Sequence, residues 1–142
     1  MPMLYHIPKS VSSPIVQCLV ELGLVGDSLV ANELSFADIK ESSYLDINPM
    51  GTAPTFQDGD VIIWESGAVL TYLLERYDTH HKLHPASLST TSTPAQIADR
   101  AKFLHLQHFI AATVYPFMAS LYIHSFKPTK QQDADYVECS KK

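Results

Sequence analysis

The residues best suited to chemistry lie in one segment, residues 51–66, which reads GTAPTFQDGDVIIWES. Within it, Pro54 stands where a strand should begin, and proline has no N–H to donate to a sheet. A cis bond before Pro54 would turn the chain and leave the backbone N–H and C=O of Ala53 free to pair with an extended peptide. The alternative is that Pro54 simply ends a loop.

Glu65 and Ser66 end the same segment and open the next predicted helix. The first N–H groups of a helix are unpaired and lie at the positive end of its dipole, so they favour a carboxylate. The Ser66 hydroxyl adds a donor, and the Glu65 carboxylate can accept from an ammonium group. The segment therefore predicts a site for a small zwitterionic peptide, although Ser66 is equally suited to capping its own helix.

Four short strands are expected to carry this segment, at residues 3–7, 29–33, 55–57 and 61–64. The last two surround Asp58-Gly59, a dipeptide typical of a tight hairpin turn. A helix lies between the first two strands, so we expect those strands to be parallel. The order predicts an α/β domain of residues 1–78, with a four-strand mixed sheet and helices on both faces.

Three helices are expected around this sheet, at residues 13–23, 36–45 and 66–77. Ser13 is predicted to cap the first helix, with Pro14 as its first residue and Gly23 at its end. The helix at residues 36–45 should be weak and irregular.

A second, all-helical domain is predicted at residues 94–142, after a polar Ser/Thr-rich linker at residues 79–93. Pro94 should open a long helix that Pro116 kinks or interrupts. Apolar residues continue to position 126, and residues 131–138 are expected to begin another helix. Although residues 103–123 are long and apolar, they contain polar side chains that are costly in a membrane, so we expect a buried helix.

Composition and charge disfavour two classes of partner. The chain has 142 residues, 46% of them apolar, and a formal net charge of −5. Nucleic acids and anionic membranes need a basic face, so neither is expected as a partner. The first ten residues lack the continuous apolar core of a signal peptide.

The cysteines and histidines of the chain do not form a complete set of metal ligands. Cys18 and Cys139 are far apart, and we expect free thiols in a reducing, cytoplasmic compartment, with a bridge between them as the alternative. His80, His81 and His84 form a cluster that no cysteine or carboxylate completes, so no metal site is expected.

Three segments resemble the cytosolic glutathione transferases. The resemblance is to the serine-type enzymes of this family, either the phi-like members or the fungal and bacterial ones. These segments are residues 4–24, 48–77 and 100–116. The second matches the pattern NPxGxxP…D…ES and is the most specific of the three. The resemblance covers roughly residues 3–126 and implies a thioredoxin-like N-terminal domain followed by helices. Members of this family continue for several more helices, so the helical domain is expected to be incomplete.

The resemblance implies a glutathione site and the residues that form it. It places Pro54 at the cis-proline, Ala53 at the backbone that pairs with the cysteinyl unit, and Glu65 and Ser66 at the γ-glutamyl unit. The other two expected binding residues are Lys40, near the glycine carboxylate, and Thr52, where the family more often has Gln or Lys.

The hydroxyl that activates the glutathione thiol is one of three serines. Counting from Tyr5 or Pro8 in the family pattern favours Ser10, while the Ser-x-Pro register of delta-like members points to Ser12. Ser13 is the third candidate. Tyr5 itself lies in the predicted strand and is expected to be a core residue, which makes a tyrosine-type enzyme the weaker interpretation.

The activity implied is conjugation of glutathione to small hydrophobic electrophiles, with peroxide reduction as a side activity, in a homodimer. His108, Ala112 and Tyr115 are candidates to line the electrophile site, since they recur at helical spacing. A core or interface position is the alternative for all three. The alternative function is a non-catalytic glutathione-binding or assembly module of the same fold.

Overall fold

The computed structural model describes residues 1–26 and 29–125, and the chain divides into two compact units, Met1–Arg100 and Ala101–Lys142. Each unit is described by itself. The first contains, in chain order, β1 (Met3–His6), α1 (Ser13–Glu21), β2 (Val30–Glu33), a 3-10 turn (Asp38–Lys40), α2 (Ser42–Leu45), β3 (Thr55–Asp58), β4 (Val61–Trp64) and α3 (Ser66–Tyr77).

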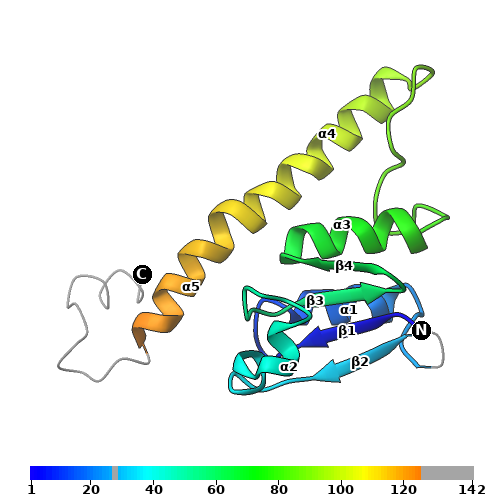
Figure 1. Cartoon of the computed structure of the whole chain (residues 1–142). Coiled ribbons are helices and arrows are strands. Elements are labelled where there is room, and N and C mark those ends of the chain that lie inside the picture. The colour runs from blue at the N-terminus through cyan, green and yellow to red at the C-terminus, as the bar shows by residue number, and fades with distance from the viewer. Residues whose placement is uncertain (27–28, 126–142) are drawn as a thin grey trace. The chain divides into compact units, whose positions relative to one another are not determined.

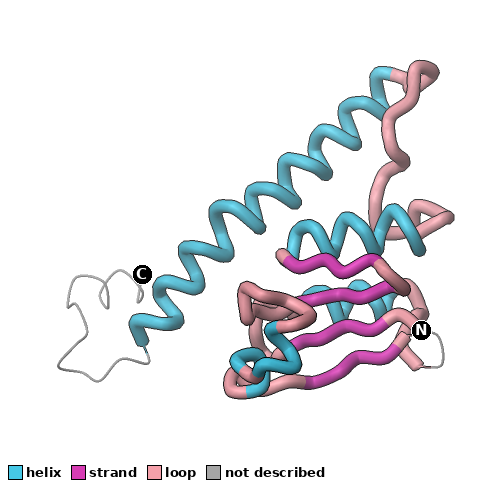
Figure 2. The backbone as a smooth tube through the Cα atoms, in the orientation of Figure 1, coloured by secondary structure: helices cyan, strands magenta, loops and turns pink. Residues whose placement is uncertain are grey.

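The four strands form one mixed sheet, as the sequence predicted, and their order is β2-β1-β3-β4 (Figures 1 and 2). β1 and β2 are parallel, whereas β1 with β3 and β3 with β4 are antiparallel. Leu4 lies opposite Ala31 on one side and Phe56 on the other. The central pair β1 and β3 therefore sets the register for both halves of the sheet.

The hairpin between β3 and β4 differs by one residue from the expectation. Asp58 pairs with Val61 and so belongs to β3. The two turn residues are therefore Gly59 and Asp60, rather than Asp58 and Gly59. Gly59 has a φ of +62°, which glycine adopts without strain and which such tight hairpin turns require.

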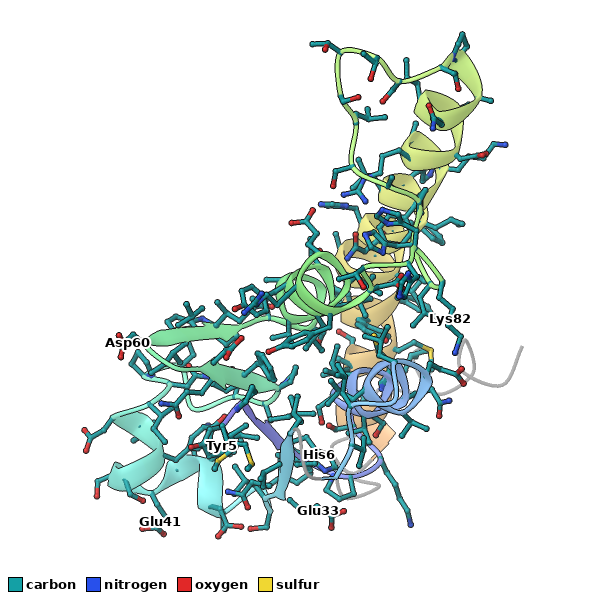
Figure 3. The ribbon with its side chains drawn as sticks, turned by 90° about the vertical axis from the view of Figure 1, so that its right-hand side faces the viewer. Tyr5, His6, Glu33, Glu41, Asp60 and Lys82 are labelled. Atoms are coloured by element: carbon teal, nitrogen blue, oxygen red, sulfur yellow. The ribbon has the colours of Figure 1, made fainter. Side chains whose placement is uncertain are left out.

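Apolar residues cover both faces of the sheet because successive residues of a strand point to opposite sides. On one face Leu4 and Phe56 pack with residues of α1 and α3, including Leu19 and Leu73. On the other face lies a smaller cluster of Ile7, Ile39 and Tyr44, with Tyr5, Leu34 and Ala53 packed against it. Tyr5 lies between the sheet and α2 (Figure 3), which confirms its expected place in the core.

The start of α1 corrects the predicted cap. Ser12, rather than Ser13, is the N-cap residue, and Ser13 is the first helical residue. The Ser12 carbonyl accepts the Ile15 N–H at 3.1 Å. The Ser12 hydroxyl makes no capping hydrogen bond, because its partners are the backbone groups of Ile7.

Cys18 lies on the buried face of α1 and is a free thiol. Burial, and secondarily the negative charge of Asp78, raise the pKa of this thiol to about 11. Since only the thiolate reacts with alkylating agents, Cys18 should be about 100-fold less reactive near neutral pH than a cysteine of ordinary pKa.

We therefore expect the Cys139→Ser variant, which leaves Cys18 alone, to resist iodoacetamide at pH 7.5 until denaturant is added. Mass spectrometry of the intact protein measures the labelling. Native-state labelling as fast as in the denatured chain would contradict the buried placement of Cys18.

The loop after α3 is held by the carboxylate of Asp78, which is buried. One of its oxygens accepts the Lys82 N–H at 2.8 Å, and the other accepts the N–H groups of Leu83 at 2.8 Å and His84 at 3.2 Å. The His84 ring adds a contact of 2.9 Å from Nδ1 to the same carboxylate. In the described part of the chain, no group of three His, Cys, Asp or Glu residues is arranged to hold a metal ion.

A long helical stretch follows, formed by α4 (Pro94–Phe109), a π-helical turn (Ile110–Val114) and α5 (Tyr115–Ser125). Pro116 has no N–H for the carbonyl four residues earlier, and its ring crowds that carbonyl. The wider π turn just before it relieves this conflict, so the proline interrupts the α-helical pattern without ending the helix. The helix expected at residues 131–138 falls outside the described residues.

Thr93 and Gln96 close the start of α4 by a reciprocal pair of hydrogen bonds. The Thr93 N–H donates to Gln96 Oε1 at 2.8 Å, and the Gln96 N–H donates to Thr93 Oγ1 at 3.3 Å. Across residues 1–26 and 29–125, no helix has both the length and the apolar character needed to cross a bilayer.

Candidate functional site

The peptide bond between Ala53 and Pro54 is cis, as the sequence predicted. The preceding carbonyl, that of Thr52, is fixed by two donors from buried side chains. Tyr44 donates its hydroxyl to Thr52 O at 2.6 Å, and Asn48 donates its amide at 2.9 Å. The backbone beside Ala53 is thus attached to α2 and to the turn that follows it.

Thr55, the first residue of β3, completes this network. Its buried hydroxyl lies 2.8 Å from the Tyr44 hydroxyl and accepts from Asn48 Nδ2 at 2.9 Å. With Tyr44 donating to Thr52 O, Thr55 can donate to Tyr44, so each of the three buried groups has a partner. Buried polar networks that are fully satisfied hold one geometry, here that of the cis-proline loop.

Removing the Tyr44 hydroxyl should therefore weaken this loop. We expect Tyr44→Phe to lower the free energy of unfolding by about 1–2 kcal/mol, because Thr52 O and Thr55 Oγ1 lose a buried partner. Urea unfolding followed by the fluorescence of Trp64, the single tryptophan, measures the change.

Tyr5→Phe is the matched control for Tyr44→Phe. Its hydroxyl makes one part-buried contact of 3.4 Å with Gln57, so the loss should stay below about 0.5 kcal/mol. Equal losses in the two variants would show that the network around Thr52 contributes nothing specific.

The ammonium group of Lys40 contacts the same loop. Its Nζ donates to the Gly51 carbonyl at 2.8 Å, while the side chain as a whole is exposed. Gly51 has a φ of +57°, and a side chain there would meet Ile39 O at 3.0 Å. Because Gly51 has no side chain, the Lys40 ammonium group can lie against the backbone immediately before Thr52 and Ala53.

Glu65 joins β4 to α3 in a conformation that is rare for a residue with a side chain. Its φ is 75° and its ψ is 122°, and it occupies the N-cap position of α3. Its carbonyl accepts the Val69 N–H at 2.9 Å. The side chain makes no capping bond and is exposed, so its carboxylate is free to meet a ligand at the helix tip. Such backbone strain is found most often at binding and catalytic sites.

Ser66 connects the tip of α3 to the loop between β1 and α1. It is the first residue of α3, and its hydroxyl donates to the Val11 carbonyl at 3.4 Å. Val11 stands between Ser10 and Ser12. Ala53 packs against the cluster that contains Ile7, the residue at the start of the same loop. The cis-proline loop, the α3 tip and the serine loop therefore meet at one end of the sheet.

The three candidate serines differ in burial and in partners. Ser12 is fully buried, and its hydroxyl accepts the Ile7 N–H at 3.0 Å and lies 2.9 Å from the Ile7 carbonyl. Ser10 is only half-buried, with its hydroxyl 2.6 Å from the same carbonyl. Ser13 is half-buried and begins α1. Of the two serines bonded to Ile7, only Ser10 is partly exposed.

The residues predicted to line an electrophile site belong to the second unit. His108 lies in the last turn of α4, two residues before the π-helical turn, and its Nδ1 is 2.9 Å from the Leu104 carbonyl. Ala112 lies within the π-helical turn, and Tyr115 begins α5. The π turn changes the helical rotation that the predicted spacing assumed, so a lining role for these residues stays a prediction.

Sequence reasoning missed the supports of the site rather than its exposed residues. Asn48 entered the prediction only as the first residue of the NPxGxxP pattern, and Tyr44 was given no role. Both side chains donate hydrogen bonds to the Thr52 carbonyl. The available signal was an asparagine six residues before the proline in a pattern that also contains Gly51. The structural role of Asp78 and the shared partner of Ser10 and Ser12 had no local signal.

The sheet order, the cis-proline loop and the helix tip define a thioredoxin-like domain. Comparison with known proteins identifies the family. Residues 3–75 match the family model "Glutathione S-transferase, N-terminal domain". The chain therefore belongs to the glutathione S-transferase family.

Individual relatives agree with this assignment. The chain is 39% identical over 98 residues to the "Glutathione S-transferase-like protein OpS6" of Beauveria bassiana, covering 68% of this chain and 41% of the relative. It is 40% identical over 72 residues to "Glutathione S-transferase 1" of Schizosaccharomyces pombe, covering 49% of this chain and 31% of the relative. The chain thus spans less than half the length of these two relatives.

A solved structure shares the fold. The glutathione transferase homologue of Lodderomyces elongisporus, crystallised with two GSH per subunit, matches with a TM-score of 0.76 at 22% identity. The match covers 96% of this chain and 62% of that protein. This likeness confirms a thioredoxin-like N-terminal domain followed by helices.

Proposed function

We propose that this chain is a glutathione transferase that binds glutathione in its first unit and conjugates it to small hydrophobic electrophiles. The observation that carries the proposal is the meeting of the serine loop, the cis-proline loop and the α3 tip at one end of the sheet. Family membership and a neighbour crystallised with GSH support it. Peroxide reduction is proposed as a side activity, and a homodimer in the cytoplasm as the working form.

In this proposal each part of glutathione has its own partner. The Ala53 backbone pairs with the cysteinyl unit, and the Thr52 backbone is held in place beside it. Glu65 accepts from the γ-glutamyl ammonium group, while Ser66 and the N–H groups of the α3 tip bind its carboxylate. Lys40 lies near the glycine carboxylate.

The chemical step needs a thiolate, because a free thiol is mostly protonated near neutral pH. We assign the stabilising hydrogen bond to Ser10, since this residue is half-buried whereas Ser12 is fully buried. Ser10 O–H donates to the sulfur and favours the anion, and the N-terminus of α1 adds a favourable dipole. The thiolate then attacks an electrophilic carbon, and the leaving group departs with the electron pair of the broken bond.

A binding experiment tests the first half of the proposal. Calorimetric titration should show glutathione binding to the wild-type chain, and Glu65→Ala should raise the Kd by at least about tenfold, because a charge-assisted hydrogen bond is lost. Asp60→Ala is the matched control: this carboxylate is exposed at the tip of the β3–β4 hairpin (Figure 3), at the other end of β4 from Glu65.

Turnover tests the second half. Conjugation of glutathione to a chloronitrobenzene substrate is expected from the wild-type chain. Binding without turnover would instead support the alternative, a non-catalytic glutathione-binding or assembly module. Equal Kd values for wild type and Glu65→Ala would contradict the assigned γ-glutamyl site, and the absence of any glutathione binding would contradict both functions.

A further inference from the structure

Ser12 is a fully buried hydroxyl with no obvious use at a binding surface. It is the N-cap residue of α1, yet its side chain turns away from the helix and bonds to both backbone groups of Ile7. Ser12 also makes two hydrogen-bond contacts with the hydroxyl oxygen of Ser10. The two hydroxyl oxygens are 2.8 Å apart, and the Ser12 N–H donates to Ser10 Oγ at 3.2 Å.

Both serine hydroxyls lie within hydrogen-bond distance of one acceptor, the Ile7 carbonyl. Ser10 Oγ lies 2.6 Å from this oxygen and Ser12 Oγ lies 2.9 Å from it. Each hydroxyl has a single proton. In the ligand-free chain Ser10 donates to Ile7 O, while the single Ser12 hydroxyl proton can go either to the same oxygen, which has two lone pairs, or to Ser10. The proton that Ser10 needs for a thiolate is therefore already committed to the backbone.

When Ser10 turns its proton toward a thiolate, Ile7 O loses its closer donor, and an unpaired buried carbonyl is costly. The Ser12 hydroxyl lies 2.9 Å from that oxygen and can keep it paired by directing its own proton there. Meanwhile the Ser12 N–H continues to donate to Ser10 Oγ and holds it in place. Ser12 can thus satisfy the backbone while Ser10 serves the sulfur.

We infer that Ser12 is a positioning residue that releases the Ser10 proton by taking over the Ile7 carbonyl. This inference rests on the proposed glutathione transferase function. It predicts that Ser12 affects the thiol only through Ser10. A residue with a merely structural role would change stability and leave the ionisation of the bound thiol unmoved.

The test is a thermodynamic cycle on the thiol of bound glutathione, measured as thiolate absorbance against pH in the complex. Ser10→Ala should lower the thiolate fraction at a pH below the pKa by about tenfold, and Ser12→Ala by about threefold. In the Ser10→Ala background, Ser12→Ala should have no further effect. Glutathione Kd should change little in any of these variants, since none removes a group assigned to the peptide backbone or its charged ends.

Other outcomes would overturn the inference. If Ser12→Ala binds glutathione with an unmoved thiolate fraction, Ser12 is structural only. If it has the full effect and Ser10→Ala has none, Ser12 is itself the donor. A wild-type chain that binds no glutathione would overturn the proposed function and this inference with it. Should Ser12→Ala fail to fold, Ser12→Cys keeps a weak donor of similar size and should give an intermediate, Ser10-dependent loss.

Discussion

Replacing Ser10 with alanine is expected to shift the pH–rate profile of conjugation toward higher pH and to lower kcat near neutral pH by about tenfold or more. The reason is that the hydrogen bond to the sulfur is made with its charged form, and such bonds contribute roughly 1.5–3 kcal/mol. Losing it raises the pKa of the bound thiol, so the thiolate becomes abundant only at higher pH. Glutathione affinity should change little, because Ser10 contacts neither charged end of the peptide in the proposed complex.

Steady-state rates from pH 5.5 to pH 9, with glutathione saturating, measure this shift. Ser13→Ala is the matched control, since it removes the hydroxyl of a nearby half-buried serine at the first position of α1. Its profile should coincide with that of the wild type. A profile that Ser10→Ala leaves in place would remove Ser10 from the mechanism.

Replacing Asp78 with alanine is expected to have the largest effect on stability, a loss of about 3 kcal/mol in the free energy of unfolding. The change leaves the N–H groups of Lys82, Leu83 and His84 without their acceptor, and it breaks a buried pair with the His84 ring. Removing one member of such a network exposes the full desolvation cost of the groups that remain. Urea unfolding followed by the fluorescence of Trp64 measures the loss.

The same carboxylate gives a pH dependence of defined sign. Burial raises the pKa of Asp78, but hydrogen bonds, first from His84 and then from the backbone of residues 82–84, outweigh burial and lower it to about 2. An unfolded aspartate has a pKa near about 3.9. The contribution of Asp78 is therefore complete above pH 4 and is lost as the pH falls toward 2.

Wild type should therefore lose more stability than Asp78→Ala when the pH falls from about 5 to about 2.5. Asp60→Ala serves as the control, because this exposed carboxylate at the hairpin tip should change stability by less than about 0.5 kcal/mol. If Asp78→Ala and Asp60→Ala lose equal stability, or if all three proteins respond alike to acid, the loop after α3 is not held by Asp78.

Much of the architecture could be predicted from the sequence because its signals are local. Alternating and helical apolar patterns identified all four strands and the helices of the first unit, and the helix between the first two strands implied their parallel pairing. The motif around Pro54 and Glu65 identified a cis bond and a helix tip. Some errors lay at element ends, such as the turn at Gly59 and Asp60, where neighbouring residues have similar propensities. The segment expected at residues 36–45 is a 3-10 turn followed by a four-residue helix. The expected burial of the helix at residues 103–123 was wrong, since several of its large apolar side chains are exposed: Leu106, Phe109, Ile110, Phe117 and Met118.

By itself, then, the sequence determined most of the elements, the mixed character of the sheet and the residues offered at its open end. Only the tertiary structure decided which serine is enclosed, because Ser10 and Ser12 have the same chemistry and differ in what covers them. It also decided that Asn48 and Asp78 serve as supports. Hydrogen-bond partners depend on where groups from separate segments meet, and that meeting is fixed by packing across the sheet rather than by neighbours along the chain.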